Sequence, residues 1–150
     1  MTVIDICNRN VVVAPKTEMI VDAAKRMRTS HVGALVVIDN RNGRHVPIGI
    51  VTDRDIVVNG LASDPEHITY LLVSDLMQRD LVTARDSDTV DEALKKMQEH
   101  GIRRLPIVDT TGALVGILTL DDVLQYVTAQ QSELVALVAK EQRHERMHRV

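Results

Sequence analysis

The sequence has almost no aromatic side chains, with two Tyr, no Phe and no Trp among 150 residues. A core built from this chain therefore depends on Val, Ile, Leu, Ala and Met. The aromatic platforms on which single-stranded nucleic acids stack are missing. The formal charge of −3 gives no general attraction to phosphate backbones or to acidic membrane surfaces. We therefore expect neither nucleic acid nor membrane as a partner.

Cysteine and long apolar runs are also scarce. The single cysteine, Cys7, cannot form an internal disulfide, which suits a reducing compartment. No stretch approaches the ~18 continuous apolar residues of a membrane span. The opening residues carry Asp and Asn where a signal peptide needs an apolar run. These absences predict a cytoplasmic protein.

What the sequence does contain is an internal repeat. The pattern Val3-x-Asp5-Ile6 recurs as Val73-x-Asp75-Leu76, an offset of 70 residues (75 − 5). Further along, Gly49 matches Gly116, an offset of 67 (116 − 49), because the loop 40–46 is three residues longer than its partner. A length change confined to a polar loop is typical of a surface turn between conserved elements of a duplicated unit.

Each copy shows the same order of patterns: a short apolar strand, an amphipathic helix, a hairpin of two buried strands and a short closing helix. In the first copy these are Val11–Val13, a helix with Ile20, Ala23, Ala24 and Met27 on one face, Ala34–Ile38, Ile48–Thr52 and Arg54–Asn59, which ends at Gly60. In the second they are Leu81–Thr83, a helix with Val90, Ala93, Leu94 and Met97 on one face, Leu105–Val108, Val115–Thr119 and Asp121–Val127. Thr89 and Glu92 fit a capping box at the start of the second amphipathic helix.

These patterns predict an α+β fold of two tandem βαββα repeats, packed sheet to sheet with pseudo-twofold symmetry, plus a C-terminal helix. One copy alone is too small to bury a sufficient core. The predicted divisions are repeat 1 at 1–60, a connector at 61–72, repeat 2 at 73–127 and an amphipathic C-terminal helix at 128–150. We expect that helix to pack either on its own module or on a second subunit.

A related phrase links the last strand to the last helix in each copy. Its shared form is Gly, two aliphatic residues, Thr, two variable residues and Asp, seen in Gly49–Asp55 and in Gly116–Asp122. Thr followed by Asp at a helix start is often only an N-cap. The same Asp, in the first helical turn, is also placed to accept hydrogen bonds from two vicinal hydroxyls, as on a ribose. Its occurrence in both copies favours a binding role.

The duplicated unit and the phrases GIVTDRD and GILTLDD resemble a pair of CBS domains, the regulatory modules named after cystathionine β-synthase. The resemblance covers about residues 1–127 and is strongest to stand-alone bacterial two-CBS proteins of the hypoxic-response type, with TDRDIV and HGIRRLPIVD close to their wording. It implies a disc-like homodimer with up to two nucleoside clefts per chain. It implies that Asp55 with Thr52, and Asp122 with Thr119, hold ribose and phosphate, and that Val13 and Thr83 lie beside the adenine.

Phosphate groups need cations, and four basic residues are candidates. Arg103 and Arg104 precede a buried strand, at the place where many nucleotide-binding family members put Arg or His. Alternatively both reach solvent or pair with acidic neighbours, Glu99 and Asp109. Gly33 and Ala34 stand at the matching place in the first copy, so we expect lopsided phosphate binding. His31 and Arg54 are weaker candidates, a turn histidine and a solvated helix residue being the plainer interpretations.

Two other features are expected to carry no chemistry. The stretch His144–His148 matches H-E-x-x-H, the helical zinc-peptidase signature, but the sequence ends at Val150 with no third ligand downstream and no shielded cleft in prospect. A solvated helix end is the expected structure, and we assign no metal site. Cys7 matches Met77 in the second copy and is expected to be a small buried hydrophobe.

The sequence therefore predicts a non-enzymatic sensor that binds AMP, ADP, ATP or a related adenosyl ligand between its repeats and relays this to an unknown protein effector. No cofactor is required. The alternative is an interaction scaffold whose clefts are degenerate. A metallopeptidase depends on the tail motif alone.

Overall fold

Each βαββα pattern folds into a three-stranded sheet with helices on one face. The computed structural model describes residues 1–148. The first repeat contains α1 (Val3–Ile6), β1 (Val13–Pro15), α2 (Ile20–Ser30), β2 (Ala34–Arg41), β3 (Arg44–Thr52) and the π-helix η1 (Asp55–Leu61). After the 3-10 turn η2 (Ile68–Tyr70), the second contains α3 (Val73–Leu76), β4 (Ala84–Arg85), α4 (Val90–His100), β5 (Arg104–Val108), β6 (Leu114–Thr119) and α5 (Leu120–His148).

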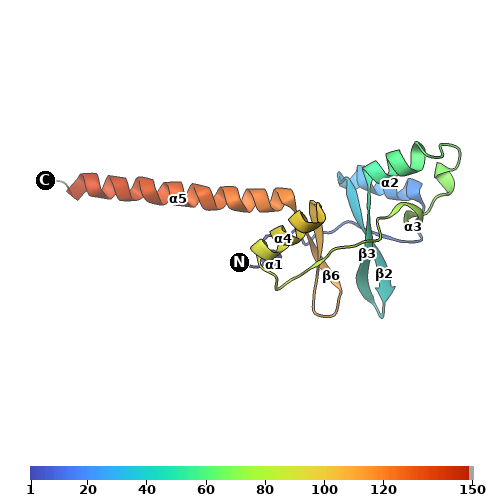
Figure 1. Cartoon of the computed structure of the whole chain (residues 1–150), viewed down its shortest axis with the longest axis horizontal. Coiled ribbons are helices and arrows are strands. Elements are labelled where there is room, and N and C mark those ends of the chain that lie inside the picture. Colours follow the sequence, from blue (N-terminus) through green and yellow to red (C-terminus); the bar gives the residue numbers. More distant parts are fainter. Residues whose placement is uncertain (149–150) are drawn as a thin grey trace.

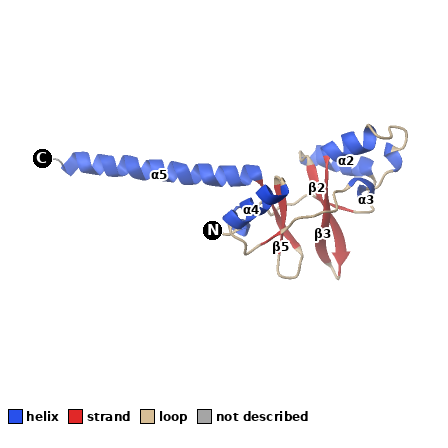
Figure 2. Cartoon of the chain, viewed as in Figure 1, coloured by secondary structure: helices blue, strands red, loops and turns tan. Residues whose placement is uncertain are grey.

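The two sheets have the same topology. In the first sheet β1 runs parallel to β2, and β2 runs antiparallel to β3. In the second sheet β4, β5 and β6 repeat this arrangement. Strands β3 and β6 contact each other where the sheets meet, and the helices α2 and α4 lie on the outer faces (Figures 1 and 2). The predicted α+β fold of two sheets and a C-terminal helix is confirmed.

The elements lie close to their predicted places, with two differences. The first hairpin is longer than predicted, since β2 runs to Arg41 and β3 begins at Arg44, so most of the expected loop 40–46 is strand. Both amphipathic helices and the capping box of Thr89 and Glu92 are confirmed. The first strand of each repeat is wrong by two to three residues, since β1 and β4 begin at Val13 and Ala84 rather than at Val11 and Leu81. The reason is that the ladder with the neighbouring strand starts only at Val13, so the apolar residues before it are free to line a cavity.

The opening segment of each repeat packs into the core of the other repeat. Val3 of α1 is fully buried in the cluster formed by the second sheet and α4, together with Leu105 and Leu118. Val73 of α3 is fully buried among residues of the first sheet and α2, such as Leu35. Neither sheet therefore has a complete core without a segment from the other half of the chain.

Backbone hydrogen bonds fix this exchange. The N–H of Asn8 donates to the carbonyl of Ile117 at 2.9 Å, and the N–H of Ile117 donates back to the carbonyl of Asn8 at 2.9 Å. Gln78 and Ile50 make the equivalent pair, at 2.8 and 3.2 Å. Each repeat therefore contributes a short strand-like segment to the edge strand of the other.

The glycine that opens each Gly-to-Asp phrase permits this close crossing. A Cβ atom at Gly49 would lie 2.7 Å from the backbone oxygen of Gln78 and 3.0 Å from the Met77 sulfur. A Cβ atom at Gly116 would lie 2.6 Å from the sulfur of Cys7. Glycine is required at both positions because another chain segment occupies the space of a side chain.

The closing helices of the two repeats differ. The first, predicted as an α-helix over Arg54–Asn59, is instead a π-helix that ends at Leu61, and its Gly60 lies against Ile68 and Leu76 so closely that a Cβ atom would clash. The second does not end at Val127 but continues as α5 to His148, and it projects away from the sheets (Figure 1). From Val127 to His148 every residue is exposed, so this part of the helix does not pack on its own module.

We predict that Gly49→Ala lowers the free energy of unfolding by about 1–3 kcal/mol, because the new methyl group meets backbone that is held by two hydrogen bonds. Urea denaturation followed by far-ultraviolet circular dichroism measures this. Gly33→Ala is the control, since the nearest atom to its Cβ, at 3.1 Å, is on the side chain of exposed Asp53, which is free to move. Equal losses in the two variants would contradict the role assigned to Gly49.

Candidate functional site

The two Thr–Asp motifs form the same turn. The N–H of Thr52 donates to Asp55 Oδ2 at 2.9 Å, and the N–H of Asp55 donates to Thr52 Oγ1 at 3.1 Å. Thr119 and Asp122 repeat this pair of bonds, at 2.8 and 3.2 Å. The cap geometry that the sequence suggested is therefore present in both copies, and it holds each carboxylate rigidly where a strand ends and a helix begins.

One of these turns opens into a cavity of about 370 Å³ that is built by both repeats. Thr119, Asp121 and Asp122 come from the end of β6 and the first turn of α5. Facing them are residues of the first repeat, from the segment before β1 and from the end of α2 to the start of β2: Asn8, Asn10, Val11, Val12, His31, Val32, Gly33 and Ala34. The cavity thus combines two aspartates of the second repeat with both polar and aliphatic residues of the first.

Arg104 is the arginine that lines this cavity. It is the direct cross-strand neighbour of Thr119 in the β5–β6 ladder, which brings the two side chains to one end of the sheet. Arg103 borders an adjacent hollow of about 350 Å³ that it shares with Arg104, Thr119, Leu120 and Asp121. Within residues 1–148 neither arginine forms an ion pair, so the expected pairing with Glu99 or Asp109 is not seen. Both residues are exposed, which agrees with the other expected alternative, that they reach solvent.

His31 both ends a helix and lines the cavity. It is the C-cap of α2 in the left-handed conformation, with φ of 54°, where the second repeat has Gly101 with φ of 62°. A residue with a Cβ atom is disfavoured there, so the backbone of His31 is mildly strained beside the cavity. Arg54 is exposed and is not part of the cavity lining.

The other Thr–Asp turn is more closed. Asp55 is only 6% exposed, whereas Asp122 is partly exposed. The side-chain amide of Gln78 lies against Asp55, with Nε2 3.3 Å from both carboxylate oxygens. The structure therefore brings Thr119, Asp122, Arg104 and His31 together in one cavity, and places Thr52 and Asp55 at a second, pseudo-equivalent position.

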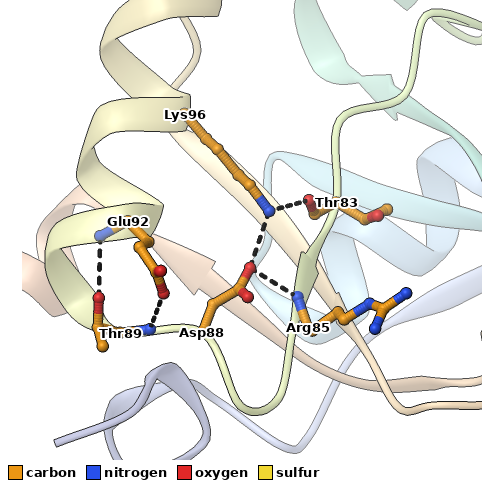
Figure 3. A network of polar contacts seen from close by, with 6 residues as sticks. All are labelled: Thr83, Arg85, Asp88, Thr89, Glu92 and Lys96. Atoms are coloured by element: carbon orange, nitrogen blue, oxygen red, sulfur yellow. Dashed lines mark hydrogen bonds and ion pairs between the residues drawn. The ribbon is translucent and has the colours of Figure 1, made fainter.

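The two residues expected beside adenine have different surroundings. Val13 borders a hollow of about 560 Å³ that also includes Val11, Val12 and Asn8. The carbonyl of Thr83 accepts a hydrogen bond from Lys96 Nζ at 3.3 Å (Figure 3). Thr83 is thereby tied to helix α4, and its carbonyl has a partner from within the chain.

A polar network surrounds Lys96. Its Nζ donates to Asp88 Oδ2 at 2.8 Å, and the same oxygen accepts the backbone N–H of Arg85 at 3.0 Å (Figure 3). Burial alone would raise the pKa of Asp88, but the hydrogen bonds from Lys96 and Arg85 outweigh it and lower the pKa below its ordinary value of 3.8. In the first repeat Glu18 and Arg26 form the corresponding ion pair.

Cys7 and the stretch His144–His148 lie outside the Thr–Asp turns and have different surroundings. Cys7 is half-buried between the repeats, and burial raises the pKa of its thiol, which disfavours the reactive thiolate. The rings of His144 and His148 lie tilted against each other, with centroids 4.3 Å apart, on the exposed part of α5. Among residues 1–148 no group of three metal-ligating side chains gathers, and none of the helices is both long and apolar enough to cross a bilayer. Residues 149–150 of the predicted tail lie outside the described part.

Sequence reasoning missed the contribution of the opening segments. Asn8, Asn10, Val11 and Val12 line the cavity of the second repeat's motif, and Gln78 contacts the first repeat's Asp55. The 70-residue offset does place Asn8 and Gln78 at equivalent positions. It gives no sign that each one crosses to the other repeat, because such a crossing leaves no local pattern.

Comparison with known protein families gives one model, described as CBS domain, that matches the chain twice, at residues 3–60 and 73–129. Among curated relatives, uncharacterized protein MK0525 of Methanopyrus kandleri is 36% identical over 137 residues, which are 91% of this chain and 66% of that protein. Hypoxic response protein 1 of Mycobacterium tuberculosis is 34% identical over 125 residues, 81% of this chain and 82% of that protein. The chain thus spans just under two thirds of the archaeal relative.

Solved structures of CBS pairs share the fold. CBSX2 of Arabidopsis thaliana in complex with AMP superimposes with a TM-score of 0.72 and 30% identity, over 87% of this chain and 98% of that one. The CBS domain pair of MJ0100, in complex with 5′-methylthioadenosine and S-adenosyl-L-methionine, gives a TM-score of 0.73 and 27% identity with the same coverage. The resemblance drawn from the two Gly-to-Asp phrases is confirmed.

The lowered pKa of Asp88 predicts a specific acid sensitivity. A carboxylate whose pKa is lower in the folded state than in the unfolded state contributes stability above the ordinary value of 3.8, and this is lost as the pH falls through the folded-state pKa. The difference in free energy of unfolding between the wild type and Asp88→Asn should therefore shrink as the pH is lowered from about 6 to about 3. Urea denaturation at a series of pH values measures it.

A matched control is Glu99→Gln. Glu99 is exposed on α4, the helix that carries Lys96, and its side chain has no hydrogen-bond or ion-pair partner in the described part of the chain. The difference in free energy of unfolding between Glu99→Gln and the wild type should change much less between about pH 6 and about pH 3. A constant difference for Asp88→Asn would show that the contact with Lys96 does not stabilise the fold.

Proposed function

The chain belongs to the CBS-domain family, and from this premise we propose that it is a non-catalytic regulatory module that binds an adenine nucleotide or related adenosyl ligand. The observation that carries the proposal is the cavity that joins Asp122 of the second repeat to the aliphatic segment of the first. It combines the two chemistries that a nucleoside needs, hydrogen-bond acceptors for the ribose and apolar walls for the base.

The ribose position follows from the hydrogen bonds of Asp122. Its Oδ2 accepts the N–H and the hydroxyl of Thr119, both at 2.8 Å. Its Oδ1 has no hydrogen-bond partner within residues 1–148, and it belongs to a side chain that lines the cavity. A carboxylate oxygen held in this way accepts hydrogen bonds from vicinal hydroxyls without rearrangement, and such charge-assisted bonds are the stronger kind.

The base position follows from the apolar wall. Val11, Val12 and Val32 are aliphatic residues in the lining of the same cavity as the carboxylate. In a chain without Phe or Trp, adenine is held between branched aliphatic groups rather than stacked on a ring. Backbone groups near β1 read the adenine edge, as the family resemblance implies for Val13.

Phosphate binding depends on Arg104. It lines the same cavity as Asp122, next to Thr119, whereas Ala34 is the cross-strand neighbour of Thr52 in the first repeat. The carboxylate of Asp121 lines the same cavity and repels negative charge, which disfavours a ligand with several phosphate groups there. We therefore place one phosphate beside Arg104, with Arg103 available in the adjacent hollow for a longer phosphate chain.

Two CBS-pair neighbours support the ligand class, since one was solved with AMP and the other with 5′-methylthioadenosine and S-adenosyl-L-methionine. All three ligands contain an adenosyl group, and they differ in what the ribose carries at its 5′ position. The adenosyl group that the three ligands share fits the part of the cavity lined by Asp122, Val11, Val12 and Val32.

Signal relay and a homodimer are part of the proposal. Asp122 lies in the first turn of α5, so a ligand that binds it contacts the helix that projects from the body. The pseudo-equivalent helices η1 and α5 expose apolar side chains, with Val57 54%, Leu61 48% and Leu124 54% exposed. A second copy covers these residues, and ligand binding shifts the arrangement of the helices to the extent that it prefers one arrangement over another.

We predict that AMP, ATP or S-adenosylmethionine raises the melting temperature of the protein, since a ligand present at 100 times its Kd adds about 2.7 kcal/mol to stability. Asp122→Ala should weaken binding at least about tenfold, because it removes charge-assisted hydrogen bonds to the ribose. Isothermal titration calorimetry measures the Kd. Asp91→Ala is the matched control, an exposed first-turn aspartate of α4 that is not part of the cavity lining. An unchanged melting temperature with all three ligands would favour the alternative, a scaffold with degenerate clefts.

We predict that the protein is a dimer in solution and that Val57→Glu or Leu124→Glu converts it to monomer, because each change buries a charge in an apolar interface. Size-exclusion chromatography with light scattering measures the mass. Leu134→Glu, on the part of α5 that leaves the body, should keep the dimer. If only Leu134→Glu dissociates the protein, the interface lies on the projecting helix instead.

A further inference from the structure

Residues 8 and 78 occupy pseudo-equivalent positions, one beside each Thr–Asp turn. Each is fixed by a pair of backbone hydrogen bonds to the last strand of the other repeat, Asn8 to Ile117 and Gln78 to Ile50. In both cases the bonded strand residue lies two positions before the Thr of the motif. Their side chains therefore start from the same place relative to the two carboxylates, and they differ by one methylene group.

That methylene decides which polar group each side chain reaches. The amide of Gln78 reaches Asp55 and donates to both carboxylate oxygens, at 3.3 Å each. The shorter Asn8 turns back on its own segment, where its Oδ1 accepts the N–H of Asn10 at 2.8 Å. Asp122 therefore receives no side-chain amide, and it keeps one oxygen without a hydrogen-bond partner in the described part of the chain.

The two carboxylates consequently differ in their availability to a ligand. Asp55 is 6% exposed and has Thr52 and Gln78 as partners, whereas Asp122 is partly exposed and faces the 370 Å³ cavity. A ribose that binds Asp55 must first displace the Gln78 amide and give up its hydrogen bonds to the charged group. A ribose that binds Asp122 displaces no side chain.

The residues that form the apolar wall at Asp122 have apolar counterparts in the second repeat. Leu81, Val82 and Ile102 stand at the positions that correspond to Val11, Val12 and Val32 by the 70-residue offset. Apolar residues are thus kept at these positions in both halves of the chain. At the second position, the Gln78 amide already binds Asp55, the carboxylate that a ribose would need.

We propose that Gln78 is a specificity-determining residue that closes the Asp55 position, so that each chain binds one adenosyl ligand, at Asp122, and not two. This inference rests on the proposed function, since it assumes that Asp122 binds the ribose. Gln78 is otherwise exposed and helps to hold the fold through its backbone, so its side chain is open to substitution.

The test is the stoichiometry of AMP binding by isothermal titration calorimetry on the full chain, with S-adenosylmethionine used in the same way if it binds more tightly. The wild type should bind one ligand per chain. Gln78→Asn, which copies the side chain of residue 8, should bind two. Asn8→Gln, which copies residue 78, should weaken binding at Asp122 at least about tenfold, because the new amide competes for the carboxylate.

The double variant Asn8→Gln/Gln78→Asn sharpens the test. It should bind one ligand per chain again, but at the other position, so that Asp55→Ala and no longer Asp122→Ala removes binding. Arg79→Gln is the control, a neighbouring exposed residue whose side chain bonds to the Ser74 carbonyl and not to either carboxylate. It should leave both the stoichiometry and the Kd unchanged.

The outcomes separate this inference from the proposed function. Two ligands per wild-type chain, or one per chain in Gln78→Asn, would overturn the role of Gln78 and leave the function intact. No binding of any adenosyl ligand by the wild type would overturn the proposed function itself. Gain of a second site in Gln78→Asn, with folding checked by circular dichroism, supports the inference.

Discussion

The structure depends on the exchange of opening segments between its two halves. Val3 and Val73 complete the apolar core of the opposite sheet, and the backbone of Asn8 and Gln78 extends the opposite edge strand. Neither half has enough apolar surface to fold stably alone, so the exchange makes one cooperative unit from two small ones. The glycine at the start of each motif, Gly49 or Gly116, is the local requirement for this crossing.

The same exchange creates the candidate site. Because residues 8–12 cross toward the second repeat, the apolar side chains before β1 face the Thr119–Asp122 turn rather than the turn of their own repeat. A cavity built by both halves is sensitive to their relative position, and a ligand bound in it links them. This supports a regulatory role, because ligand binding then stabilises one arrangement of the halves and of helix α5 over others.

Pseudo-symmetry explains how one duplicated sequence acquires two different sites. The Thr–Asp turn and the crossing segment are alike around Asp55 and Asp122, although the helices that follow differ. Within this shared frame three pairs of side chains distinguish the two positions: Gln78 against Asn8, Ala34 against Arg104, and Gly101 against His31. A duplicated fold keeps its stability from the shared backbone hydrogen bonds and core residues. The side chains at the edges of the clefts contribute little to the core and are free to diverge toward different binding properties.

The amino-acid sequence by itself determined the elements and the family. The 70-residue repeat, the helical spacing of apolar residues and the two Gly-to-Asp phrases predicted the α+β fold and the CBS resemblance, since all of these are local patterns with a fixed period. The Thr–Asp turns were predicted too, because a cap is formed by residues three positions apart.

Only the tertiary structure decided how the halves combine. The pairing of Asn8 with Ile117, the joining of Arg104 to a cavity with Val11, and the contact of Gln78 with Asp55 link residues far apart in sequence, and no periodic pattern records such contacts. The continuity of the last helix was missed for a related reason. Separate helices were predicted at Asp121–Val127 and at 128–150, but α5 runs unbroken from Leu120 to His148, and its exposed part from Val127 onward does not pack on the body.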